Sequence, residues 1–170
     1  MAVYFGGSRH WSLSLGSIPQ VVQAVNASGQ SVHVGCQLGA DAHVVQCALP
    51  SSLVVFAVAP LWSLAPAHVV KAFSFGARVV LGAGGSVAPM PARYLLRSIA
   101  AFQGCESAVF FSPGAGSLAV ARECIKSGLP VFAFGEQPAR VPSVAGQWVD
   151  AWFLGFNCWQ WSAPKQESLF

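Results

Sequence analysis

Short runs of apolar residues, rich in Val, Ala and Phe, alternate along the chain with longer segments of mixed polarity. Runs without an exposed polar side are typical of parallel strands that helices cover on both faces. The runs predict six strands, over residues 2–5, 31–35, 53–57, 77–81, 108–111 and 130–134. The segments between them predict crossover helices over residues 17–28, 40–48, 65–75, 91–102 and 116–127. This alternation favours a doubly wound, mainly parallel α/β sheet of the Rossmann-like kind, with six to seven strands and helices on both faces.

The pattern changes after residue 134. A polar, proline-bearing connection over 135–142 leads to an aromatic, strand-like segment over 147–156. Trp148, Trp152, Trp159 and Trp161 all fall in this part of the chain. We therefore divide the chain into a domain over 1–135 and an aromatic-rich extension over 136–170. The extension is expected to pack on the same domain or at a dimer interface.

The high apolar content raises the question of a membrane segment, since 54% of the residues are hydrophobic and the mean hydropathy is +0.55. The longest uncharged stretch lies between Asp41 and Lys71, but prolines interrupt it well short of the roughly 18–20 apolar residues that a spanning helix needs. No basic region precedes an apolar stretch at the N-terminus, so no secretory signal is visible. We expect a cytoplasmic protein without membrane contact.

Charged and metal-binding residue types restrict the chemistry further. Nine Lys and Arg against six Asp and Glu give a net charge of +3 without any basic run, which permits an anionic ligand. The five cysteines are widely spaced and typical of buried thiols in a reduced protein. The four histidines show no metal-ligand spacing. We therefore expect no metal and no required cofactor, but a nucleotide or another phosphate-containing ligand.

Four of the predicted strands end in glycine-rich turns that precede a helical segment. Such turns let the backbone approach a ligand, and the helix that follows presents unpaired N–H groups to an anion. The turns and the helix beside them supply the candidate binding residues Gly6, Gly7, Ser8, Arg9, Gly35, Gly39, Asp41, Gly84, Arg97, Gly114, Ala115, Gly116 and Ser117. No catalytic residue is assigned. Each turn can also be an ordinary strand-to-helix connection, and no complete phosphate-binding signature is present.

Two candidate residues have a structural alternative. Asp41 is well placed to cap the helix that it begins, which is at least as good an interpretation as a contact with a ligand. Arg97 lies four residues after Arg93, so both can project from one helical face toward solvent or toward a ligand. The sequence leaves both questions open.

The order of these motifs resembles the SLOG superfamily of Rossmann-like nucleotide-binding domains, which includes the DprA (Smf) and LOG families. The similarity covers about residues 3–135. Residues 7–9 read Gly-Ser-Arg after the first strand, 35–41 read Gly-Cys-Gln-Leu-Gly-Ala-Asp, and 97–101 read Arg-Ser-Ile-Ala-Ala. Residues 116–121 read Gly-Ser-Leu-Ala-Val-Ala and 128–133 read Gly-Leu-Pro-Val-Phe-Ala. The resemblance implies nucleotide binding, which we expect at the carboxyl edge of the sheet. In this hypothesis the phosphate is held by Gly7, Ser8, Arg9, Gly114, Gly116 and Ser117, and the nucleoside side is lined by Gly39, Asp41 and Arg97.

Departures from the family patterns shape the functional prediction. Val120 stands where LOG enzymes carry a catalytic glutamate, and Glu123 lies three residues further on. Leu38 stands where DprA-type proteins often carry a basic residue. The main hypothesis is therefore a non-catalytic protein that binds a small-molecule nucleotide. The alternatives are a LOG-like nucleoside-monophosphate phosphoribohydrolase and a DprA-like protein that binds single-stranded DNA, nucleic acid being the less favoured partner. A homodimer is expected by analogy.

Overall fold

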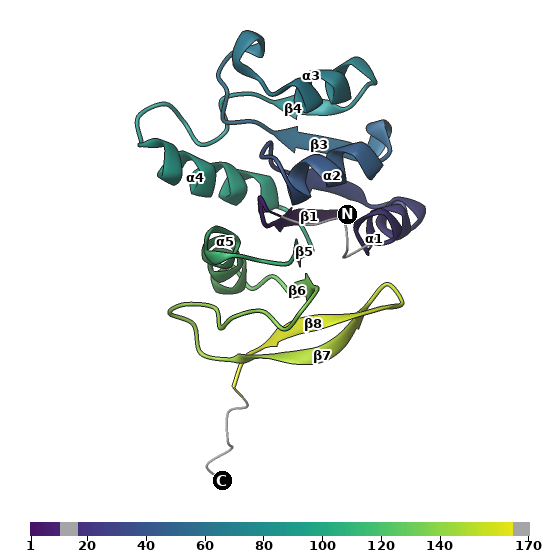
Figure 1. The fold of residues 1–170 in the computed structure, drawn as a ribbon, viewed down its shortest axis with the longest axis vertical. Helices are drawn as coiled ribbons and strands as arrows, with labels where there is room; N and C mark the ends of the chain where they lie inside the picture. The colour runs from purple at the N-terminus through teal and green to yellow at the C-terminus, as the bar shows by residue number, and fades with distance from the viewer. Residues whose placement is uncertain (11–16, 165–170) are drawn as a thin grey trace.

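One sheet of eight strands runs through residues 1–10 and 17–164, which are the residues that the computed structural model describes. Its strand order is β4-β3-β2-β1-β5-β6-β8-β7, from one end of the molecule to the other (Figure 1). The strands are β1 (Ala2–Gly7), β2 (Ser31–Val34), β3 (Leu53–Phe56), β4 (Arg78–Val80), β5 (Ser107–Phe111), β6 (Val131–Phe134), β7 (Gln147–Phe153) and β8 (Phe156–Ser162). The first six strands pair in parallel. Among the described residues, no helix has the length and apolar character that crossing a bilayer requires.

Helices cover both faces of the sheet. Along β1 the side chains alternate between two cores, with Val3 and Phe5 in one and Tyr4 in the other. The first core contains residues of α1 (Ser17–Ala27), α2 (Ala40–Cys47) and α3 (Ala67–Ser74). The second contains residues of α4 (Met90–Phe102) and α5 (Ala115–Lys126). Two short 3-10 helices, η2 (Pro50–Ser52) and η3 (Trp62–Leu64), lie in the connections before and after β3.

All six predicted parallel strands and all five predicted helices are confirmed, with bounds that shift by only a few residues. The mainly parallel, Rossmann-like architecture with helices on both faces is confirmed as well. The chain builds β1 to β4 outward in one direction and then returns through α4 to place β5 beside β1. The strand order therefore reverses between β1 and β5, which is where open α/β sheets bind their ligands.

The predicted count of six to seven strands is wrong, because the C-terminal extension forms a hairpin of two strands rather than one. Leu154 and Gly155, both with positive φ (49° and 86°), make a two-residue turn between β7 and β8. Two positive φ values suit the twist of an antiparallel hairpin. The hairpin is held by Trp148 and Trp161, whose rings meet edge to face at 5.3 Å.

The extension continues the sheet of the domain before it, since β8 pairs antiparallel with β6. Trp148 also donates a hydrogen bond from its ring nitrogen to the carbonyl of Ala139, at 2.9 Å, and so ties the connection before β7 to the hairpin. Residues 165–170 of the predicted extension lie outside the described residues. A dimer interface on this extension stays a prediction.

Candidate functional site

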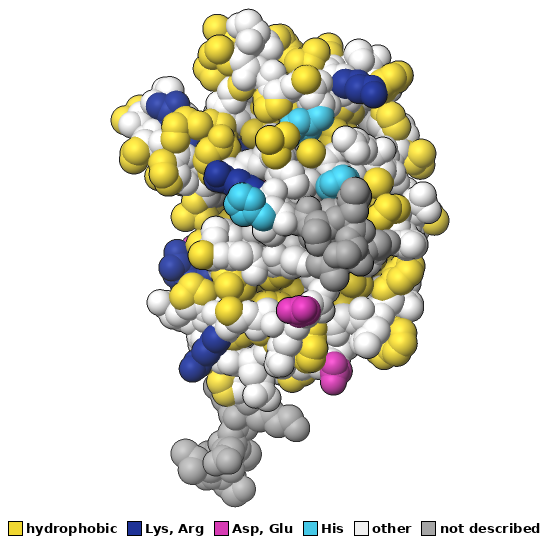
Figure 2. All heavy atoms as spheres, viewed as in Figure 1, with side chains coloured by type: hydrophobic (Ala, Val, Ile, Leu, Met, Phe, Trp, Pro, Cys, Tyr) yellow, Lys and Arg dark blue, Asp and Glu magenta, His cyan; other side chains and the backbone are white. Residues whose placement is uncertain are grey.

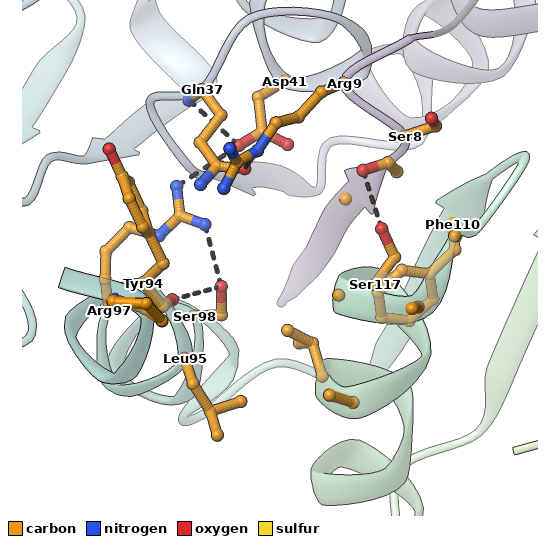
Figure 3. Close-up of a pocket in the computed structure, with 18 of the residues that line it drawn as sticks. Ser8, Arg9, Gln37, Asp41, Tyr94, Leu95, Arg97, Ser98, Phe110 and Ser117 are labelled. Atoms are coloured by element: carbon orange, nitrogen blue, oxygen red, sulfur yellow. Dashed lines mark hydrogen bonds and ion pairs between the residues drawn. The ribbon is translucent and has the colours of Figure 1, made fainter. Parts of the chain in front are cut away.

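A pocket of about 450 Å³ opens at the carboxyl ends of β1 and β5, where the strand order reverses. Five parts of the chain supply its lining: β1 with the turn after it, the segment that leads from β2 into α2, helix α4, strand β5, and the first turns of α5. Figure 3 shows the side chains of these parts converging on one space. Its size is within the range of small-molecule sites in proteins, about 300–1,000 Å³.

Close backbone packing forms the first wall of the pocket. Gly7 ends β1, and a Cβ atom there would lie 2.5 Å from the carbonyl oxygen of Phe111 and 2.6 Å from Cβ of Ala40. Only glycine therefore fits at this point. Beyond it, the N–H of Ser8 donates to the carbonyl of Phe111 at 3.1 Å, and the hydroxyl of Ser8 accepts from the N–H of His10 at 3.1 Å. The turn after β1 is thereby fixed against β5.

Helix α5 begins at the pocket without a side-chain cap. Gly114 is its N-cap, no side chain bonds its first N–H groups, and its first turn has no acidic residue. Gly114, Ala115 and Gly116 are exposed. The hydroxyl of Ser117 donates to the carbonyl of Gly7 at 2.7 Å, so its proton is already used. The open N–H groups and the partial positive charge of a 12-residue helix thus face the pocket, as an anion site requires.

Two guanidinium groups lie against one aromatic ring at the side of the pocket. The guanidinium carbons of Arg9 and Arg97 lie 5.4 Å and 5.7 Å from the centre of the Tyr94 ring. Arg9 reaches over from the turn after β1 and donates from Nε to Oε1 of Gln37 at 3.1 Å (Figure 3). Arg9 is exposed, whereas only 4% of Arg97 is. Arg9 is therefore the cation of this pair that is open to solvent.

A buried ion pair joins α2 to α4 below this surface. Nη1 of Arg97 lies 3.3 Å from Oδ2 of Asp41, which is only 5% exposed. Oδ2 also accepts the N–H of Gln37 at 3.2 Å, and Nη2 of Arg97 donates to the hydroxyl of Ser98 at 2.9 Å. A Cβ atom on Gly35 would overlap this pair. The pair is thus packed tightly, and Asp41 neutralises Arg97. The interpretation of Asp41 as a helix cap is wrong, because Asp41 is the second residue of α2, its N-cap is Gly39, and no side-chain cap bond is present among the described residues.

Burial and charge act on the ionisable groups of this pair in different ways. Burial raises the pKa of Asp41, although Arg97 and the N–H of Gln37 stabilise its carboxylate. Burial disfavours the charge of Arg97, but Asp41, Tyr4 and Cys36 together outweigh it, and the pKa of Arg97 is raised. Burial also raises the pKa of the Tyr4 phenol at the base of the pocket. Arg97 stays charged in the fold, and Tyr4 stays a neutral phenol.

Most of the predicted binding residues line the pocket, and the exceptions have packing roles. The lining contains all of the candidates except Gly35, Gly39 and Gly84. Gly39, with φ +81°, lies against the carbonyl groups of Ser8 and Arg9. Gly84, with φ +97°, lies against the backbone of α4. These three glycines allow the segments that build the pocket to approach one another. Whether the lining residues bind a ligand stays a prediction.

Several residues that line the pocket were not identified from the sequence. Tyr94, Gln37 and Leu95 line the pocket, as do the buried rings of Tyr4 and Phe110. Tyr94 lies three residues before Arg97 on the same helix, and residues with this spacing share a helix face, so the spacing could have indicated Tyr94 as a neighbour of Arg97. Arg93 was paired with Arg97 on one helical face, but it bonds the carbonyl groups of Ser86 and Ala88 and does not line the pocket.

The carboxylates decide which chemistry the described residues support. Val120 lines the pocket, whereas Glu123 does not, and pairs instead with Arg122 at 2.7 Å and with Lys126 at 3.4 Å on the surface of α5. Within residues 1–10 and 17–164, no group of three or more His, Cys, Asp or Glu is arranged to hold a metal ion. The carboxylate that the described residues bring to the pocket is therefore Asp41, and it is paired with Arg97.

Known structures similar to this fold include two of DNA processing protein A (DprA). The Helicobacter pylori protein, whose structure concerns its single-stranded DNA binding mode, matches with a TM-score of 0.66 at 19% identity, over 84% of this chain and 67% of that one. The Streptococcus pneumoniae protein matches with a TM-score of 0.63 at 18% identity, over 84% of this chain and 52% of that one. This chain thus spans about two thirds and about half of those proteins. No family model and no curated protein matches its sequence.

Proposed function

We propose that this chain binds single-stranded DNA and seats one nucleotide of the strand in the pocket, without chemistry on it. The observation that carries the proposal is the uncapped start of α5, which lines the same pocket as Arg9. The N–H groups of Ala115 and Gly116 would receive a phosphate, and the guanidinium of Arg9 would pair with it. No other charged side chain of the described lining is both exposed and unpaired with a carboxylate.

The apolar part of the pocket suits the rest of a nucleotide. Leu95, Phe110 and Val120 line it next to the Tyr94 ring. Aromatic rings hold the bases of single strands by stacking, which is tolerant of sequence because every base has a π-face. The Helicobacter pylori protein with the same fold binds single-stranded DNA, which favours a strand over a free nucleotide as the ligand.

A free nucleotide is the second candidate, because a pocket of about 450 Å³ has room for a single nucleotide. The same contacts would hold it, so competition separates the two ligands. Thymidine monophosphate should displace labelled oligothymidylate only at concentrations far above the Kd of the strand. If the monophosphate and the strand bind with equal affinity, a free nucleotide becomes the better candidate ligand and single-stranded DNA the second. The phosphoribohydrolase alternative lacks a free carboxylate among the described lining residues.

Fluorescence anisotropy with labelled dT20 at low salt tests the proposal. Ala115→Glu is the sharpest variant, because a carboxylate in the first turn of α5 repels phosphate while it complements the helix dipole. We expect loss of DNA binding with an unchanged or slightly raised Tm. Arg9→Ala should weaken binding about tenfold, since hydrogen bonds to charged groups are worth about 1.5–3 kcal/mol.

Lys126→Ala is the matched control, since it removes one positive charge at the far end of α5, roughly 16 Å along the helix axis from Ala115. It should bind dT20 nearly as well as the unmodified protein. If Ala115→Glu binds dT20 with unchanged affinity, the pocket is not the DNA site. If Lys126→Ala weakens binding as much as Arg9→Ala does, the effect is one of net charge alone.

A further inference from the structure

An exposed aromatic surface lies on η3 and the end of α3, outside the pocket. Two rings that pack together form it, and we call them the aromatic platform: Trp62 (40% exposed) and Phe73 (52%). The rings of Trp62 and Phe73 have centroids 4.5 Å apart. Aromatic side chains of this size are normally buried or partnered, so such a cluster marks an interaction surface.

The charges around the platform all have one sign. Nζ of Lys71 lies 5.9 Å from the centre of the Phe75 ring, and Arg78 is exposed on the neighbouring edge strand β4. No Asp or Glu occurs anywhere between Asp41 and Glu106, a stretch that includes η3, α3, β4 and α4. Figure 2 shows hydrophobic and basic side chains together over the α3 end of the molecule, while the acidic side chains visible on this face lie toward the other end.

We propose that the aromatic platform is a second contact surface for a single-stranded nucleic acid, whose bases stack on Trp62 and Phe73 while the exposed side chains of Lys71 and Arg78, on α3 and the neighbouring strand β4, attract its phosphates. Aromatic rings combined with cations are the recurring means of holding single strands. A second copy of this chain fits less well, because a twofold contact through the platform would bring Lys71 and Arg78 of both copies together without an acidic partner.

The platform lies within reach of a strand that is held in the pocket. Helix η3 follows β3, and the carboxyl end of β3 is two strand positions, roughly 10 Å, from that of β1. A strand that leaves the pocket across the ends of β2 and β3 reaches η3 first, where Trp62 lies against Phe73 of α3, the helix that runs back along the sheet toward β4. The platform proposal rests on the proposed function only in taking single-stranded nucleic acid as the ligand, because the platform and the pocket are made of different residues.

Oligonucleotide length separates the two surfaces. Trp62→Ser and Phe73→Ser should each raise the Kd for dT20 about tenfold, while the Kd for dT4, which occupies only the pocket, changes by less than about twofold. Trp152→Ser is the matched control, because Trp152 is 71% exposed on β7, at the other end of the sheet. All three substitutions are at exposed positions, and unchanged Tm values verify that the fold is kept.

The charge-reversal variant Lys71→Glu/Arg78→Glu tests the same surface without touching a ring, and should also weaken dT20 binding about tenfold. If dT20 binding is unchanged in the ring variants and in this one, the proposal is wrong. Two other outcomes would also contradict the proposal. In one, the ring variants leave DNA binding intact but turn a dimer into a monomer in light scattering. In the other, they abolish binding of an acidic protein but not binding of DNA.

Cross-linking distinguishes failure of this proposal from failure of the proposed function. A dT20 strand that contains 5-iodo-deoxyuridine should cross-link to the platform rings on irradiation, as peptide mapping by mass spectrometry would show. Cross-links confined to Tyr94 would refute DNA binding at the platform and would be consistent with DNA binding in the pocket. If Ala115→Glu keeps full affinity for dT20 and Phe73→Ser loses it, the pocket is wrong and the platform stands.

Discussion

Replacing Asp41 with alanine should destabilise the protein strongly, because the change leaves the charge of Arg97 buried without a partner. The two side chains are 5% and 4% exposed and lie 3.3 Å apart. Removing one partner of a buried ion pair costs about 3–5 kcal/mol, a large part of the roughly 5–15 kcal/mol that stabilises a domain. For a chain of this size each kcal/mol lowers Tm by about 2–4 °C, so we expect a fall of roughly 6–20 °C.

Thermal unfolding followed by circular dichroism measures the effect. Glu123→Ala is the control, because it breaks an ion pair on the surface of α5 and should change Tm far less. The double variant Asp41→Ala/Arg97→Met removes both charges and should be more stable than Asp41→Ala alone. A Tm for Asp41→Ala within about a degree of the unmodified protein, or a double variant no more stable than the single one, would refute the reasoning.

Three further predictions concern partly buried groups. Gly84→Ala should cost more than about 1 kcal/mol in denaturant unfolding, because its φ is +97° and the added methyl group meets the carbonyl of Arg93; no loss of stability would contradict this. Burial holds the pKa of His33 below its ordinary 6.5, so the unfolded chain takes up the proton first and stability should fall as pH drops below about 6.5. A His33→Gln variant should lose less stability between about pH 8 and pH 5, and an equal loss would exclude His33 as a cause. Burial raises the pKa of Cys105 to about 12, so iodoacetamide at about pH 8 should label this thiol only after unfolding; equal labelling of the native protein would contradict it.

The parallel part of the fold could be read from the sequence because its strands are buried on both faces. In β5 all five residues are buried, and the run over 108–111 has no polar position, so it stands out from its surroundings. The hairpin lacks this signal, because exposed residues such as Gln147, Asp150 and Trp152 interrupt β7. Its turn is Leu154-Gly155 instead of the Asn-Gly that usually marks a hairpin, so its second strand was missed.

The pocket was predictable in position but only partly in its residues. Glycine signals close approach, yet the sequence does not say whether the approaching group is a ligand or another segment of the chain. Gly116 has open space around it, whereas Gly35 faces the ion pair of Asp41 and Arg97. The two glycines look alike in sequence, and only the three-dimensional neighbours separate them. Tyr94 was missed because its role depends on a side chain from a distant turn, that of Arg9.

The buried ion pair also sets how strongly salt should weaken DNA binding. Since Asp41 neutralises Arg97, Arg9 is the described lining cation left to meet a phosphate, and the pocket alone should give a slope of log K against log salt near −0.7. Lys71 and Arg78 on the platform would bring the total to three phosphates and the slope to about −2 for a long strand. Binding of dT20 and dT4 over a range of salt concentrations measures both slopes. A slope near −0.7 for both lengths would mean that the strand meets the protein only at the pocket, whereas a steep slope for dT20 that Lys71→Glu/Arg78→Glu removes requires the platform.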